Sequence, residues 1–109
     1  MTNYKAGDIV LVVFPFAGGE QSKSRPAMVV LDGGDADIVV ARITTQLHQT
    51  LYDTPIADWR GGGLLAPSMV RLHKLATLEK ALVRRKLGSL QPKDLPIVAT
   101  MMQRIYGDW

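Results

Sequence analysis

The first half of the chain consists of short runs of β-branched residues that end at proline, glycine or polar turns. The first run covers residues 7–14 and stops at Pro15, which has no amide proton to donate to a β-ladder. Two further runs, at 27–31 and 37–44, are separated by the turn signal at 32–35. We therefore expect three strands, with the second and third paired as an antiparallel meander.

The second half carries weaker strand signals. A short strand is compatible with residues 52–56, and the three glycines at 61–63 indicate a hinge or tight loop, since too few residues flank them for two separate cores. The segments 68–78 and 83–90 mix basic and apolar residues, which suits the short curved strands of a small barrel. The stretch 78–87 also fits a helix, and the pattern leaves that alternative open.

The clearest regular element is a helix near the C-terminal end. Pro92 suits a first-turn position, and Asp94 suits the same turn. Apolar residues then recur every three to four positions, as in a helix that packs by one stripe: Leu95, Val98, Ala99, Met102 and Ile105 or Tyr106. Many short strands followed by one helix predict a mainly β (α+β) fold, with a closed or nearly closed barrel and a C-terminal helix.

Length and composition favour one soluble domain over residues 1–109, of which 47% are hydrophobic. No apolar run approaches the ~20 residues of a membrane helix, and no export signal precedes the first strand. We expect a cytoplasmic protein without a membrane partner. The absence of cysteine excludes disulfides, thiolate catalysis and cysteine-based zinc sites. Two histidines without a nearby acidic cluster predict no metal.

The net charge of +3 is unevenly distributed along the chain. Residues 1–60 carry five Lys/Arg and seven Asp/Glu, a net charge of −2, whereas residues 61–109 carry eight and three, a net charge of +5. A concentration of positive charge suggests a polyanionic partner, because phosphates attract it independently of sequence. A solvated basic surface explains the same composition equally well.

Four short motifs, taken in order, resemble the MazF/PemK family of toxins. They are Gly-Asp-Ile-Val-Leu-Val from Gly7, Ser24-Arg25-Pro26-Ala27 after a glycine-containing loop, Ile43-Thr44-Thr45-Gln46, and Gly-x-Leu-x-Pro-x-Asp-Leu leading into the terminal helix. Each motif is weak alone, but their order and spacing from about Gly7 to Gly107 are fairly specific.

The resemblance implies a type II toxin–antitoxin toxin on an SH3-like small β-barrel that pairs as a homodimer. It also implies an endoribonuclease that cleaves single-stranded mRNA sequence-selectively, without metal or another cofactor, and so inhibits growth. A further implication is a cognate antitoxin whose acidic, disordered tail occupies the RNA groove. Such cleavage proceeds by attack of the ribose 2′-hydroxyl on the adjacent phosphorus, which requires a base, an acid and donors for charged oxygens.

Arg25 and Thr44 are the first catalytic candidates. Pro26 should hold Arg25 extended at the mouth of the second strand, where its guanidinium fork suits phosphate oxygens. Alternation in the third strand places Val39, Ala41 and Ile43 on one face and Val40, Arg42 and Thr44 on the other. If the first set is core, Arg42 and Thr44 point outward together. There is an alternative for each residue. Arg25 could be a surface arginine that only pairs with a nearby carboxylate, and Thr44 could be an ordinary polar residue at the end of a strand.

Arg71 and His73 are the second catalytic pair, because a spacing of two in a strand places them on one face. In PemK-like members an arginine and an aspartate with this spacing have the acid and base roles, and His73 stands where the aspartate would be. An imidazole can act as the base, and neighbouring cations favour its neutral form. The substitution is equally compatible with a weakened enzyme or a merely packed histidine.

Further residues are candidates for RNA binding, through phosphates or unstacked bases. These are Lys23, Arg42, Thr45, Gln46, His48, Arg84 and Arg85. The alternatives are an ordinary loop residue or a second catalytic imidazole for His48, and a solvated rim for Arg84 and Arg85. Two other functions remain open: a catalytically inactive barrel that binds nucleic acid or a peptide, and a purely structural dimer.

Overall fold

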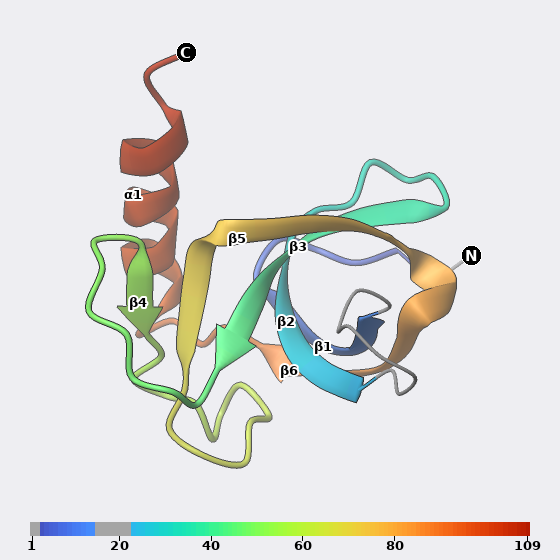
Figure 1. Ribbon diagram of the computed structural model, residues 1–109, viewed down its shortest axis with the longest axis horizontal. Helices are drawn as coiled ribbons and strands as arrows, with labels where there is room; N and C mark the ends of the chain where they lie inside the picture. The colour runs from blue at the N-terminus through green and yellow to red at the C-terminus, as the bar shows by residue number, and fades with distance from the viewer. Residues whose placement is uncertain (1–2, 15–22) are drawn as a thin grey trace.

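The computed structural model describes residues 3–14 and 23–109, which form a curved antiparallel sheet and one long helix (Figure 1). The elements are β1 (Asp8–Phe14), β2 (Lys23–Leu31), β3 (Asp37–Thr44), β4 (Asp53–Pro55), β5 (Met69–Glu79), the 3-10 turn η1 (Lys80–Leu82), β6 (Val83–Ser89) and α1 (Leu95–Tyr106). The hydrogen-bonded strand order is β4-β5-β3-β2-β1-β6. The mainly β fold with a C-terminal helix is confirmed. Among the described residues no ladder joins β6 to β4, so the sheet curls without closing into a ring.

β1 and β3 match the predicted strands closely, whereas β2 is longer than predicted. It begins at Lys23 instead of residue 27, because its pairing with β1 continues to the register pair Phe14 and Lys23. Arg25 therefore lies inside a paired strand, opposite Val12, and not at its mouth. The residues at this end of β2 are polar, so their sequence gave no strand signal. They are extended because they pair with β1.

The helical alternative for residues 78–87 is wrong, and the predicted start of the terminal helix also needs correction. β5 runs through Glu79, η1 makes one short turn, and β6 follows directly. α1 begins at Leu95 with Asp94 as its N-cap residue, so Pro92 precedes the helix and Pro96 occupies the first turn. Pro96 is tolerated there, because first-turn amides have no partner within the helix.

The core has two layers, one on each face of the curved sheet. The inner face buries Val10, Val12, Phe14, Ala27, Val29, Ile38, Val40 and Leu78. The other face packs residues such as Ile9, Met28, Ala41, Ile43, Val70 and Leu72 against Leu90 and Val98 of the C-terminal segment. Val40 is thus fully buried on the face that the sequence assigned to solvent. Strands covered on both faces carry continuous apolar runs, which conceal their alternation.

Two side chains, one at each end of α1, attach the helix beside β4 and β5 (Figure 1). The buried Asp94 carboxylate accepts hydrogen bonds from the backbone N–H groups of Ala57 and Asp58, at 2.7 and 2.8 Å. At the other end of the helix, the Tyr106 hydroxyl donates to the Leu72 carbonyl at 2.6 Å. These bonds hold the helix against the bend of β5.

The three glycines at 61–63 form a tight loop that lies against β6. Gly63 has a φ of +89°, and a Cβ atom at this position would lie 2.1 Å from the Leu87 carbonyl oxygen. A Cβ on Gly88 would lie 2.3 Å from the Gly62 carbonyl oxygen. Only glycine permits backbones to approach this closely.

Candidate functional site

A groove of about 520 Å³ lies where the inner face of the sheet changes from apolar to polar. Val40, Arg42 and Thr44 alternate along β3, so the buried valine is followed on the same face by a guanidinium and a hydroxyl. Seven of the predicted site residues line this groove: Arg25, Arg42, Thr44, Thr45, Gln46, His48 and Arg71. We call it the cationic groove.

Strand register explains why residues distant in sequence meet in the cationic groove. Arg42 of β3 lies opposite Ala27 of β2 on one side and opposite Arg71 of β5 on the other. Arg25, two residues before Ala27, lines the groove together with Thr44, two residues after Arg42. The Arg42 guanidinium carbon lies 5.2 Å from the centre of the Phe14 ring, a cation–π contact that holds it over the core.

Within residues 3–14 and 23–109, the Thr44 hydroxyl donates no hydrogen bond. Its oxygen accepts the Gln46 backbone N–H at 3.1 Å, a local turn that also positions Gln46 at the groove. The hydroxyl proton can then be donated to an oxygen of a bound ligand. Thr44 is half-buried, so the hydroxyl is within reach of solvent.

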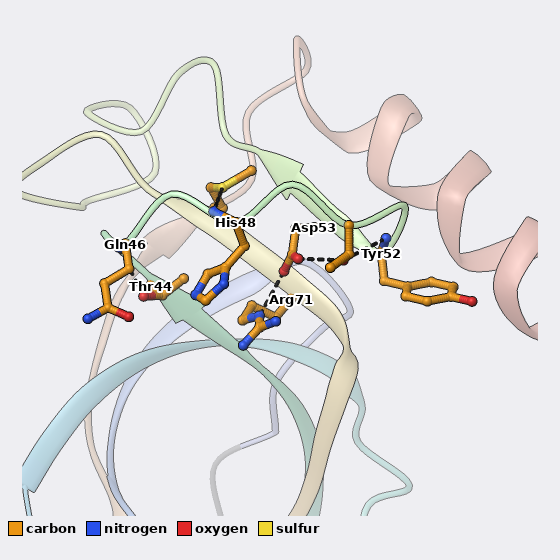
Figure 2. Close-up of polar contacts among 8 residues, drawn as sticks. Thr44, Gln46, His48, Tyr52, Asp53 and Arg71 are labelled. Atoms are coloured by element: carbon orange, nitrogen blue, oxygen red, sulfur yellow. Dashed lines mark hydrogen bonds and ion pairs between the residues drawn. The ribbon is translucent and has the colours of Figure 1, made fainter.

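Arg71 is fixed by a buried carboxylate that the sequence analysis did not identify. Asp53 lies opposite Arg71 in the β4–β5 ladder, and Arg71 Nε donates to Asp53 Oδ1 at 2.8 Å. The Thr50 hydroxyl donates to the second oxygen, Asp53 Oδ2 (Figure 2). No local motif could reveal this pair, because its members lie eighteen residues apart and meet only through strand pairing.

The pKa of Asp53 reflects these contacts. Burial alone would raise it, but hydrogen bonds from Arg71 and Thr50, and the charges of Arg71 and His48, lower the pKa below its usual value of 3.8. Asp53 is therefore a carboxylate at neutral pH. The influence of His48 on this carboxylate agrees with Figure 2, in which the imidazole lies beside Arg71 and Thr44.

The groove carries a net positive charge. Arg25 and Arg42 make no ion pair with any residue in 3–14 or 23–109, and Arg71 makes one, with Asp53. Three guanidinium groups thus face one carboxylate. Such a site attracts a polyanion and offers several planar donor forks for phosphate oxygens.

His73 is not among the residues that line the cationic groove, so the structure does not bring it together with Arg71 there. Its ring packs against the Tyr52 ring, with the centroids 5.0 Å apart, and its buried Nδ1 atom has no hydrogen-bond partner in the described part of the chain. Alternation holds as far as His73, since Val70 and Leu72 are buried in one core layer and Arg71 and His73, which alternate with them, are half-buried. The β3–β5 register then shifts from the pair Arg42–Arg71 to the pair Ala41–Leu75, so His73 has no register partner on β3.

Three predicted RNA contacts also lie away from the lining of the groove. Lys23 is exposed at the first position of β2, opposite Phe14. Arg84 and Arg85 are exposed on β6, and β1 and β2 separate that strand from β3 in the sheet. The structure therefore does not bring these three cations together with Arg25 and Arg71.

The described residues contain no group of three or more His, Cys, Asp or Glu side chains that could hold a metal ion. None of the helical segments described is both long enough and apolar enough to cross a membrane.

Comparison with known proteins yields one family and a consistent set of folds. Residues 5–106 match the family described as PemK-like, MazF-like toxin of type II toxin-antitoxin system. The sequence matches no curated protein.

Among solved structures, the Mycobacterium tuberculosis toxin MazF-mt6 is similar with a TM-score of 0.75 and 21% identity, over 94% of this chain and 99% of that one. An endoribonuclease in complex with its cognate antitoxin, from a mycobacterial species, gives a TM-score of 0.73 and 18% identity over 95% of both chains. A MazE–MazF structure from Deinococcus radiodurans gives 0.77 and 20% identity over 100% of both. At these identities the likeness establishes the fold alone.

Proposed function

Since this chain belongs to the PemK-like, MazF-like toxins of type II toxin–antitoxin systems, we propose that it is a sequence-selective endoribonuclease. It cleaves single-stranded mRNA without a metal ion, in the cytoplasm, and so inhibits growth. The observation that carries the proposal is that Arg25, Thr44 and Arg71 line one solvent-open groove. One of the similar structures is itself described as an endoribonuclease.

The proposed reaction is an internal transesterification of RNA. The ribose 2′-oxygen attacks the adjacent phosphorus and loses its proton to a base, while the bond to the 5′-oxygen breaks and that oxygen gains a proton. The products are a 2′,3′-cyclic phosphate and a 5′-hydroxyl end. Negative charge grows on the non-bridging oxygens, so preorganised donors at those atoms lower the barrier.

The cationic groove contains donors for the charged oxygens and one group for proton transfer. Arg25 and the terminal amino groups of Arg71 hold the non-bridging oxygens, and the Thr44 hydroxyl donates to one of them or orients the attacking hydroxyl. His48 is the imidazole that moves a proton, since it lines the groove and His73 does not. Arg42, Thr45 and Gln46 contact the flanking nucleotides.

The decisive experiment is cleavage of a defined single-stranded RNA by the purified protein in EDTA, with both new ends mapped. We expect a cyclic phosphate on one side of the cut. Arg25→Ala should lower kcat by about 10²- to 10³-fold, as for loss of one oxyanion donor, with an unchanged circular dichroism spectrum. Lys23→Ala is the matched control, because it removes an exposed cation from the same strand outside the groove.

Folded wild-type protein that leaves RNA intact would refute the proposal, and so would full activity of Arg25→Ala. RNA binding with a steep salt dependence but no new ends would instead support a binding module. The change from aspartate to histidine at position 73, relative to PemK-like members, favours this second function.

We also propose a homodimer and a cognate antitoxin with an acidic, partly apolar disordered tail that folds onto the cationic groove. The positive charge of the groove supports such a tail, and two of the similar structures contain an antitoxin partner. Adding the antitoxin should abolish cleavage and displace RNA. Unchanged cleavage in a stable complex would contradict this mode of inhibition.

A further inference from the structure

Asp53 is a buried charge at the edge of the cationic groove. Its side chain is fully shielded from solvent, while the Arg71 side chain it contacts is 20% exposed. A buried carboxylate is costly unless its oxygens are paired. Here each oxygen has one partner: Oδ1 accepts from Arg71 Nε, and Oδ2 accepts from the Thr50 hydroxyl (Figure 2).

The geometry of this contact leaves most of the Arg71 guanidinium free to bind a ligand. Asp53 engages the single Nε–H group, so the two terminal amino groups make no hydrogen bond with the described residues. A guanidinium is planar with a fixed fork of donors, so one anchored donor sets the direction of the other four. Because Arg71 lines the groove, its terminal donors are available there.

We infer that Asp53 is a positioning residue for the ribonuclease reaction, acting through Arg71, with Thr50 holding Asp53 in turn. This inference rests on the proposed function and assigns a role to two residues of that site. Asp53 fixes the plane of the guanidinium so that its terminal amino groups meet the scissile phosphate without reorganisation. Asp53 does not touch the substrate.

The carboxylate has opposite effects on catalysis and on RNA affinity. Asp53→Asn removes one negative charge from a site with three arginines, so attraction for RNA should stay equal or increase. The guanidinium loses its charge-assisted anchor and its orientation, so kcat should fall by about 10²-fold, as for a small displacement of a catalytic group. A merely structural defect would instead weaken RNA binding together with turnover.

The test combines cleavage kinetics, affinity and a direct probe of Arg71. Asp53→Asn should lower kcat while the Kd for a non-cleavable 2′-deoxy analogue of the RNA stays equal or decreases. In ¹⁵N NMR spectra the Arg71 Nε–H resonance should be protected from exchange in the wild type and broadened in the variant. Asp8→Asn is the matched control, because Asp8 is also buried and pairs with Lys86 and Ser89 away from the groove.

Variants of Thr50 provide a milder test if Asp53→Asn folds poorly. Thr50→Val removes one hydrogen bond to Asp53 and should lower kcat by less than Asp53→Asn, whereas Thr50→Ser keeps the donor and should restore turnover. Wild-type kcat in Asp53→Asn, or an unchanged Arg71 resonance, would overturn the inference. If the wild-type protein leaves RNA intact, the proposed function is wrong, and so is the role of Asp53 in catalysis. The NMR comparison still decides, independently of cleavage, whether Asp53 anchors Arg71.

Discussion

At the scale of single residues, His48 and His73 have different surroundings. His48 is half-buried, its backbone N–H lies 3.4 Å from the Met69 sulfur, and it lines the cationic groove. His73 packs on Tyr52 outside the groove. A proton-transfer role needs contact with the reacting atoms, so our proposal gives this role to His48 and not to His73.

We therefore predict that His48→Gln lowers kcat/KM by about 10²-fold or more, the range for general acid–base catalysis. The measurement is kcat/KM for cleavage of the defined RNA. His73→Gln is the control and should keep the wild-type rate. Loss of cleavage in His73→Gln alone would contradict this assignment and restore the original one.

At the scale of elements, the sequence predicts strands well where burial alone determines them. β1 and β3 are apolar on both faces and end at recognisable turns, so both were predicted within one residue. The start of β2 was missed because its polar residues are extended by pairing with β1 and not by their own preference. Strand partners and register are properties of the folded sheet, which a local pattern does not encode.

The same distinction applies to the candidate site. Arg25, Thr44 and Arg71 were identified because they belong to recognisable motifs, and the structure brings them to one groove. Asp53 was missed because its contact with Arg71 arises from the β4–β5 ladder. His73 lies where the β3–β5 register shifts, and no local pattern in the sequence predicts that shift.

The Asp32 carboxylate connects the N-terminal segment, the turn after β2 and η1. It accepts hydrogen bonds from the backbone N–H groups of Tyr4, at 2.7 Å, and Gly34, at 2.8 Å, and pairs with Lys80 of η1 at 2.9 Å. Hydrogen bonds from Tyr4, Lys80 and Gly34 lower the pKa of Asp32 from 3.8 to about 2. A carboxyl group with a lowered pKa stabilises the fold above its unfolded-state pKa.

We expect Asp32→Asn to lower the free energy of unfolding at neutral pH. The difference from the wild type should be constant above about pH 5, where Asp32 is ionised in both states, and should decrease between about pH 4 and pH 2. Urea unfolding at a series of pH values checks this. The exposed Asp108→Asn is the control and should show no such change. A difference that persists undiminished at pH 2 would show that the ionised carboxylate is not the stabilising group.

At the scale of the whole molecule, the arginines predicted to bind RNA lie in two separate regions of the described structure. One is the cationic groove across β2, β3 and β5, and the other is the exposed Arg84 and Arg85 on the edge strand β6. The net charge of +3 does not distinguish them. A flexible RNA strand can run along the groove alone or continue over β6, and the salt dependence of binding separates these paths.

Each phosphate contact contributes about 0.7 to the slope of log Kd against log salt for single-stranded nucleic acid. With a non-cleavable RNA analogue, we expect Arg25→Ala to reduce this slope by about 0.7, which corresponds to the loss of one phosphate contact. The double variant Arg84→Ala/Arg85→Ala should keep the wild-type slope. Fluorescence anisotropy at several KCl concentrations measures both. Since the double variant removes twice the charge, retention of its slope shows that location, and not total charge, determines binding. A reduced slope in the double variant would instead place the RNA path over β6, as the sequence alone had suggested.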